Sequence, residues 1–311
     1  MKKLFLILII LFVLTVGLFV YVKHGVEDEF GIVFFDVGQG DSTLINFVDG
    51  SRMLVDCGKD KAVLYKLGKY IPFFDRQIDY LLITHFDLDH YGGCNDVLKR
   101  YDVKNIITNG IPGTDRYYKE YERIEELENA EMSIVNEYKK ISIGSSTIEF
   151  LSPLEEFNFT DKNDASVVFK LSNSSTIALF VGDLEEKGEE KLLEKYCSTT
   201  SVIPDLIRDI SKEVRDRKDS DFRQNDSGVL SNINQCEILN SEILKVGHHG
   251  SSGSSSEEFL QAVSPQKSII SVGRNNFGHP SRRVIKKLER ISSEILRTDL
   301  IGDVTVLESV E

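Results

Sequence analysis

Residues 81–90 read LLITHFDLDH, an apolar strand that ends in a cluster of ligand-type side chains. Four polar groups fall within six residues of this stretch: His85, Asp87, Asp89 and His90. Burying them in a core without a compensating partner would be costly. Alternation places the first three on one side of the chain, with His90 adjacent. We therefore predict a short loop that holds two cations, rather than a polar surface turn.

Three further apolar strands also end in Asp or His. Asp56 follows MLV, Asp183 follows LFVG, and the pair His248-His249 follows LKVG. Because strand–helix folds gather ligands at the carboxyl edge of a sheet, we expect these side chains to lie beside the 81–90 cluster.

The N-terminus carries an uncharged run at residues 4–22, LFLILIILFVLTVGLFVYV. As a helix its 19 residues span roughly 28 Å, close to the hydrocarbon thickness of a bilayer. Lys2 and Lys3 precede the run, and the positive-inside rule then places the rest of the chain outside the cytoplasm. We predict a signal anchor over 1–27 and one extracytoplasmic domain over 28–311. A cleaved signal peptide, giving a secreted protein, is the alternative, ahead of a buried core helix.

The composition is that of a globular protein, with 41% hydrophobic residues and a net charge of −13. It excludes a disordered chain, a collagen and a polytopic membrane protein, and it argues against a surface devoted to nucleic acid. Residues 274–297 are the exception, because seven basic and two acidic residues give a local charge of +5. This segment suits a polyanionic substrate, with a solvated helix face as the alternative.

Short apolar runs broken by Gly, Asp and Asn indicate an α+β protein. The predicted strands are 32–37, 43–47, 52–55, 78–84, 103–108, 141–143, 147–151, 166–171, 176–181, 242–246 and 267–272. The predicted helices are 95–100, 117–131, 185–196 and 282–291, and a further helix begins at a capping box of Ser255 with Glu258. Strands come first in pairs and then mix with helices, which favours two packed sheets with helices outside.

A polar, charged segment at 198–237 interrupts this alternation. We predict a surface insertion, with a substrate-gripping lid as the alternative. Cys197 and Cys236 bracket the segment, while Cys57 and Cys94 each adjoin a motif. The pairing of Cys197 with Cys236 and of Cys57 with Cys94 is the one to test first, against four free thiols.

Taken together, these stretches resemble the metallo-β-lactamase-fold hydrolases, and more closely the extracytoplasmic nuclease domain of the competence protein ComEC and its stand-alone relatives. The HxHxDH signature of the fold is present at 85–90, with Asp87 in place of the second His. The other shared stretches are 36–41 DVGQGD, 163–166 NDAS, 180–183 FVGD, 245–251 KVGHHGS, 271–273 SVG and 276–281 NFGHPS.

The resemblance implies an αββα sandwich with a two-metal site at one edge. The implied ligands are His85 and Asp87 for one metal, Asp89, His90 and His248 for the other, and Asp183 as the bridge, with Asp56 and Asp164 supporting them from outside. The family's third-motif His is missing, since NDAS occupies that region. This change and the Asp at position 87 make the site richer in oxygen, which favours Mn²⁺ over Zn²⁺.

By this resemblance, a hydroxide bridging two divalent metals attacks phosphorus or a carbonyl carbon. Asp183, His249 and His279 are the candidate catalytic residues, the two histidines orienting the substrate or protonating the leaving oxygen. We predict a membrane-anchored, metal-dependent phosphodiesterase, and more specifically a DNase linked to DNA uptake. The alternatives are hydrolysis of another extracellular ester, such as phosphorylcholine, and a non-catalytic metal-stabilised binding module.

Overall fold

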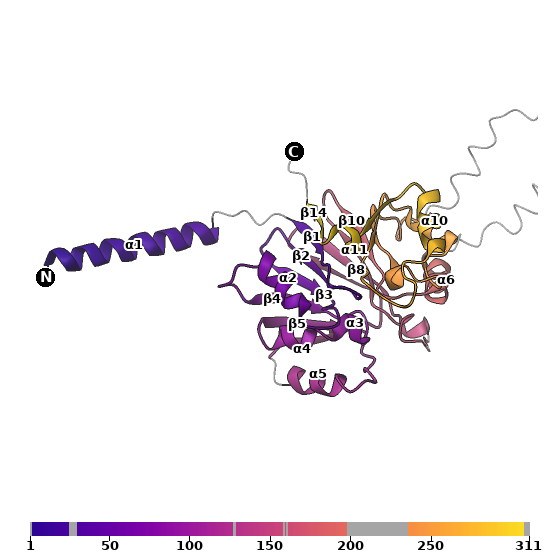
Figure 1. Cartoon of the computed structure of the whole chain (residues 1–311), viewed down its shortest axis with the longest axis horizontal. Coiled ribbons are helices and arrows are strands. Elements are labelled where there is room, and N and C mark those ends of the chain that lie inside the picture. Colours follow the sequence, from indigo (N-terminus) through magenta and orange to yellow (C-terminus); the bar gives the residue numbers. More distant parts are fainter. Residues whose placement is uncertain are drawn as a thin grey trace, which may run out of the picture.

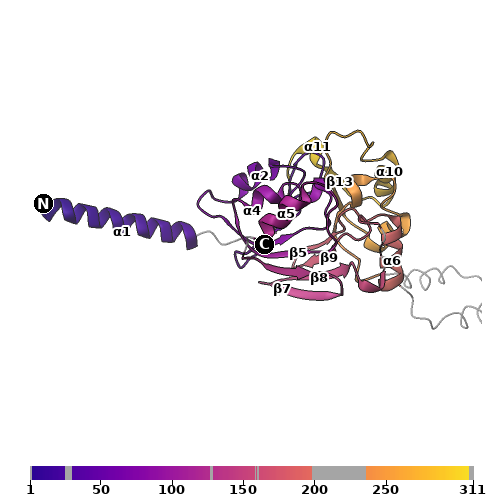
Figure 2. The same ribbon diagram turned by 90° about the horizontal axis from the view of Figure 1, so that it is seen from below.

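The computed structural model describes residues 2–24, 30–126, 129–157, 159, 161–197 and 236–307. Two seven-stranded sheets pack face to face within this part of the chain, and helices cover both outer faces (Figures 1 and 2). The αββα sandwich predicted from the sequence is confirmed. Most of the insertion predicted at 198–237 lies outside the described residues.

The first sheet is built from the N-terminal half of the chain and closed by the last strand. Its strands in spatial order are β14 (Val304–Leu307), β1 (Gly31–Phe34), β2 (Thr43–Asn46), β3 (Arg52–Val55), β4 (Gln77–Leu82), β5 (Asp102–Thr108) and β6 (Glu131–Ile134). Strands β14 to β3 pair antiparallel, and β3 to β6 pair parallel. The parallel part places the carboxyl ends of its strands at one edge.

The second sheet has the same mixture of antiparallel and parallel strands. Its strands in spatial order are β13 (Glu294–Arg297), β12 (Lys267–Ile270), β11 (Ile243–Lys245), β10 (Ile177–Phe180), β9 (Val168–Ser172), β8 (Ser146–Ser152) and β7 (Lys139–Ile143). Strands β10 to β13 pair parallel, and β7 to β10 pair antiparallel.

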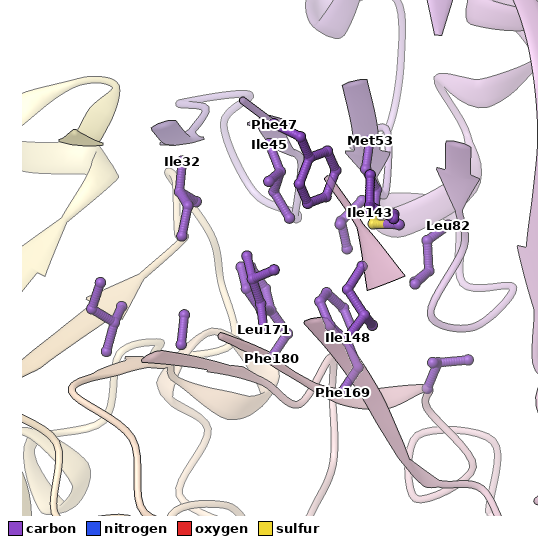
Figure 3. Packing of buried hydrophobic residues seen from close by; sticks show 14 of the residues in the cluster. Ile32, Ile45, Phe47, Met53, Leu82, Ile143, Ile148, Phe169, Leu171 and Phe180 are labelled. Carbon is purple, nitrogen blue, oxygen red and sulfur yellow. The ribbon is translucent and has the colours of Figure 1, made fainter. Parts of the chain in front are cut away.

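The core between the sheets is aliphatic and aromatic (Figure 3). The Phe180 ring stacks at 4.6 Å on Phe169 of the same sheet and at 5.7 Å on Phe34 of the other sheet, measured between centroids. Because successive strand residues point to opposite faces, Phe34 enters this core while its neighbours Val33 and Phe35 enter the layer under the helices. Strand β1 is therefore buried on both faces, and truncating one of these rings to Ala would cost about 3–5 kcal/mol.

Helices cover each sheet by packing an apolar stripe on it. The first sheet is covered by α2 (Ala62–Tyr70), α4 (Cys94–Leu98) and α5 (Tyr118–Glu125), and the second by α6 (Glu186–Tyr196), α9 (Glu257–Val263) and α10 (Arg282–Arg290). The short elements are α3 (Leu88–Tyr91), η1 (Glu155–Phe157), η2 (Gly247–Gly250) and α11 (Thr298–Ile301). In α10, Val284 and Leu288 are buried, and the Ser281 hydroxyl caps the helix by accepting from the Val284 amide.

Two sequence-based expectations about helices are wrong. The helix predicted over 117–131 is only α5, and Glu131 already belongs to β6, because Glu131–Ile134 pairs in parallel with β5. The cap of α9 is Ser256, whose side chain accepts from the Phe259 amide, and not Ser255. The first expectation fails because pairing with β5 makes Glu131–Ile134 a strand. The second fails because the helix begins one residue later than expected.

The N-terminal helix α1 (Lys2–His24) stands apart from the sheets in both views (Figures 1 and 2). Its side chains are described over residues 3–17, and all of these are exposed. Within the part of the chain that the structure describes, no helix combines the length and the apolar character needed to cross a membrane. The membrane segment predicted over 4–22 is not supported by this finding.

Both predicted disulfides are present. Cys57 is bonded to Cys94 and Cys197 to Cys236, with Cα–Cα distances of 5.2 Å and 4.9 Å. The alternative of four free thiols is therefore wrong. The first bond ties the segment after β3 to the start of α4.

Candidate metal centre

The candidate site lies at the edge where parallel strands of both sheets end. Asp56 follows β3 and His85 follows β4, two neighbouring strands of the first sheet, while Asp183 follows β10 and His248-His249 follow β11, two neighbours in the second. Packing of the sheets then brings the two pairs of strand ends together. The side chains singled out at strand ends thus lie in one place.

The Asp183 carboxylate occupies the middle of this cluster. Its Oδ2 atom lies 3.6 Å from Nε2 of His248, 3.6 Å from Nε2 of His249 and 4.0 Å from Nε2 of His85. Its Oδ1 atom lies 3.1 Å from Nε2 of His90. One carboxylate therefore faces four imidazoles, and among these five side chains only His248 is more than 5% exposed.

Three residues of the site have a strained backbone conformation. Asp56, His248 and His249 have φ values of 56°, 47° and 53°, in the left-handed region that residues with a Cβ rarely adopt. Such strain concentrates at functional sites, where the surrounding structure over-determines the conformation.

Several buried polar atoms in the cluster have no hydrogen-bond partner within the described residues. They are Nε2 of His85, His90 and His249, and Oδ1 of Asp41 and Asp183. Each unpaired buried group costs about 1–3 kcal/mol, unless a further group satisfies it. In each of four sets, the ligand atoms lie within 4.8 Å of one another: His85, His90 and Asp183; Asp89, His90 and His249; Asp41, Asp56 and His90; and Asp41, Asp183 and His249. This donor set fits divalent cations.

In His90 and His248, the ring nitrogen that points away from the cluster lies within hydrogen-bond distance of a carboxylate oxygen. Nδ1 of His90 lies 2.8 Å from Oδ2 of Asp56, and Nδ1 of His248 lies 2.9 Å from Oε1 of Glu185. Asp56 also accepts from the amide and the hydroxyl of Thr84. Metal-binding histidines commonly keep their second nitrogen in such a bond, which fixes the ring and its tautomer. Asp56 therefore stands where a supporting residue was predicted.

The cluster sets the pKa values of its buried imidazoles in opposite directions. Burial, followed by the charge of His90, lowers the pKa of His85 to about 4. Burial also acts to lower the pKa values of His90 and His249, but nearby carboxylates, Asp183 first, outweigh it. They raise the pKa of His90 well above its usual range and that of His249 to about 10. Two imidazoles thus hold protons at neutral pH in the metal-free protein, at positions that a divalent cation would take over.

The two aspartates of the 85–90 motif differ in their surroundings. Asp87 is partly exposed, pairs with Lys162, and places Oδ2 3.8 Å from Nε2 of His85. Asp89 places Oδ2 3.3 Å from Nε2 of His249. Burial acts to raise the pKa of Asp89, but His249, whose Nε2 lies 3.3 Å away, and the charge of His90 outweigh it, so the pKa is lowered. Both carboxylates are available as ligands.

The segment in place of the family's third motif supports the site from outside. Oδ1 of Asp164 accepts from the amides of Glu185 and Gly188, at 3.1 Å each, and so fixes the chain just after Asp183. The Ser166 hydroxyl accepts from the Asp183 amide at 3.2 Å. Asp164 thus holds the loop and is not grouped with the converging ligand atoms.

The two histidines predicted to act on the substrate lie at different depths. His249 is fully buried, and its Nε2 atom is part of the ligand cluster itself. His279 lies in the loop before α10, with its ring centroid 5.4 Å from that of His248. Burial first, and then the charges of His248 and His249, lower the pKa of His279. His279 therefore stands at the mouth of the cluster as a neutral imidazole.

The sequence did not reveal a buried ion pair that lies next to His249 of the cluster. The ammonium of Lys245 lies 2.7 Å from Oδ2 of Asp41, and Oδ1 of Asp41 lies 3.2 Å from Nδ1 of His249. Burial acts to raise the pKa of Asp41, but the charges of Lys245 and His249 outweigh it and lower the pKa. The available signal was a lysine inside the buried strand β11, where an uncompensated charge is not tolerated.

The Metallo-beta-lactamase superfamily model matches residues 35–274 of the chain. The chain belongs to this superfamily. It is similar to the ComE operon protein 3 of Bacillus subtilis (strain 168), with 29% identity over 308 residues that cover 92% of this chain and 34% of that protein. It is also similar to the competence protein ComA of Neisseria gonorrhoeae, with 28% identity over 282 residues, covering 89% and 32% of the two chains.

This metallo-β-lactamase-fold chain therefore spans about a third of the length of the curated relatives that it matches. Among solved structures, the fold of the Bacillus subtilis protein YhfI matches with a TM-score of 0.50 at 13% identity, covering 90% of this chain and 100% of that one. That likeness concerns the fold alone. The superfamily and the converging His and Asp side chains together identify a metal-binding hydrolase fold related to competence proteins.

Proposed function

We propose that this chain is a metal-dependent phosphodiesterase that cleaves DNA. The observation that carries the proposal is the Asp183 carboxylate facing four imidazoles, with buried ligand atoms around it that lack partners within the described residues. Two divalent cations bound there would supply a water of lowered pKa and positive charge for the phosphoryl oxygens. The competence-protein relatives favour DNA over other phosphodiesters.

The proposed ligand assignment follows the motif order. His85 and Asp87 would hold one cation, Asp89, His90 and His248 would hold the other, and Asp183, whose carboxylate faces both groups, would serve as a further ligand. His249 supports this arrangement from the floor of the site, since its Nε2 lies among the same atoms. The high share of carboxylate oxygen favours Mn²⁺ over Zn²⁺.

The chain's own residues then orient the substrate. His279, a neutral imidazole beside His248, donates one hydrogen bond to a phosphate oxygen. Arg274, Arg282 and Lys286 are exposed and have no ion-pair partner within the described residues, unlike the buried Lys287, which lies 3.6 Å from Glu186. These basic side chains suit the phosphate backbone of a polyanion.

Placement of the domain outside the cytoplasm is part of the same proposal. Two disulfides and the lack of a free thiol support an oxidising compartment. A fusion of alkaline phosphatase to residue 27 tests this, because the enzyme is active only where its own disulfides form; an inactive, stable fusion would refute it.

The catalytic proposal is tested with the full chain in detergent, supplied with Mn²⁺, Mg²⁺ or Zn²⁺. The substrates are single- and double-stranded DNA and bis-p-nitrophenyl phosphate. We expect metal-dependent DNA cleavage that Asp183→Asn abolishes, while the exposed control Asp102→Asn keeps it. Cleavage of the small diester without DNA would favour the alternative of another extracellular ester, such as phosphorylcholine. Metal binding with no turnover would favour the binding module.

A further inference from the structure

The loop between β12 and α10, residues 271–281, presents an aromatic ring to solvent next to the candidate metal centre. Phe277 is 76% exposed, although most large apolar side chains in the described sheets are buried. No aromatic platform of this kind was expected from the sequence. Because the loop that carries Phe277 is ordered by hydrogen bonds, the exposure of this ring calls for an explanation.

A single amide side chain builds this loop. Oδ1 of Asn275 accepts from the amides of Phe277, Gly278 and His279, at 3.1, 3.0 and 3.1 Å. Its Nδ2 donates to the carbonyls of Gly273 and His279, at 2.8 and 2.9 Å. Five hydrogen bonds to one Asn fix the backbone on both sides of Phe277. The ring is therefore presented by an ordered backbone.

The base of the loop is anchored at the edge that carries the site. The Gly273 amide donates to Oε1 of Gln39 at 3.3 Å, and a Cβ on Gly273 would lie 2.3 Å from the carbonyl carbon of Gly38. Only glycine permits this close approach to the 36–41 segment, which also carries Asp41. The loop and the floor of the candidate centre are thus packed together.

A row of rings connects Phe277 with that centre. The Phe277 and His279 rings stack at 5.8 Å with an interplanar angle of 22°, and the His279 and His248 rings lie 5.4 Å apart. Nε2 of His248 then lies 3.6 Å from Asp183. Phe277 is therefore connected with the cluster through two imidazoles.

We propose that Phe277 stacks on a nucleobase beside the scissile phosphate, so that the site takes DNA whose bases are unpaired. This inference rests on the proposed phosphodiesterase function. A base in an intact duplex is already stacked on both faces, so only single strands and frayed ends offer a free face. The exposed Arg274, on the same loop, and Arg282, at the start of α10, precede and follow Phe277 in the sequence and suit the neighbouring phosphates.

The test compares Phe277→Ala and Phe277→Leu, which lack a π-face, with Phe277→Trp, which keeps one. On single-stranded DNA with natural bases, kcat/KM is expected to fall about 5- to 150-fold for the first two and to stay close to wild type for the third. On an oligonucleotide whose sugars lack bases, all four proteins should react at the same rate. Phe73→Ala, which truncates a ring that is 86% exposed on the loop after α2, is the matched control and should change neither rate.

A binding measurement separates this inference from the catalytic proposal. With 2-aminopurine in the single strand and chelator in place of metal, stacking on Phe277 should quench fluorescence in the wild type and in F277W but not in F277L. Unchanged kcat/KM and quenching in F277L would overturn the stacking role while DNA cleavage by the wild type stands. An equal loss on natural and base-free strands would overturn it too. No cleavage by the wild type, with quenching that depends on Phe277, would overturn only the nuclease proposal.

Discussion

Replacing Lys245 by Met is expected to destabilise the protein by about 3–5 kcal/mol, the usual cost of removing one partner from a buried ion pair. The Lys245 side chain is 3% exposed, and its ammonium lies 2.7 Å from Asp41. At an effective dielectric constant of about 20, charges 2.7 Å apart attract by about 6 kcal/mol, and the lost hydration offsets part of this. Met keeps the apolar stem, so the change isolates the charge and leaves Asp41 with His249 alone.

Thermal unfolding of the metal-free chain at pH 7, followed by circular dichroism, measures this cost. Each kcal/mol shifts the Tm of a domain of this size by about 2–4 °C, so a fall of about 6–20 °C is expected. The double variant D41N/K245M, which removes both charges, should regain most of it. Lys104→Met, which breaks an exposed pair with Asp102, is the control and should cost at most about 1 kcal/mol.

The reasoning is refuted if K245M melts as close to the wild type as Lys104→Met does. It is also refuted if the double variant loses as much as the two single variants together, because the two charges would then not be coupled.

Binding of divalent cations should release protons and tighten as the pH rises, because the metal-free pKa values of His90 and His249 lie above neutrality, that of His249 at about 10. Calorimetry in buffers of different ionisation enthalpy measures the release, and a binding heat that does not depend on the buffer would contradict it. The metal-free protein should also lose stability as the pH rises from about 6.5 to about 10, since a raised imidazole pKa stabilises the fold only while its proton stays bound. Melting curves across this range test the sign, and a flat or rising Tm would count against it. Replacing Cys57 and Cys94 by Ser should cost about 4 kcal/mol, because their bond spans a sequence separation of 37 residues. Urea unfolding measures this cost, and an unchanged midpoint would show that the loop constraint contributes nothing.

The location of the candidate centre was predictable because strand ends carry it. Asp56 follows β3 directly, His85 and Asp183 lie three residues beyond the ends of β4 and β10, and parallel strands place such positions at one sheet edge. Asp41 and Lys245 were not found, because they meet only through packing of the two sheets. A lysine within a short apolar strand gives no indication of which carboxylate will neutralise it.

The strands that were not predicted from the sequence share one physical feature. Strands β6, β13 and β14 are four-residue edge strands whose side chains are mostly exposed or half-buried, so the hydrophobic alternation that marks a strand is weak. Glu131–Ile134 is extended because β5 offers it a parallel partner. The interior strands, buried on one or both faces, carried that signal and were predicted close to their observed bounds.

The pairing of β1 with β14 has a consequence for how the chain folds during synthesis. Gly31 lies opposite Leu307, and the Asp36 amide donates to Asp303, a contact that spans 267 positions. A nascent chain therefore cannot complete its first sheet until residues 304–307 have left the ribosome. Until then one edge of β1 remains open to foreign strands. We expect a chain that stops before residue 304 to aggregate, because β1 then keeps an unpaired edge.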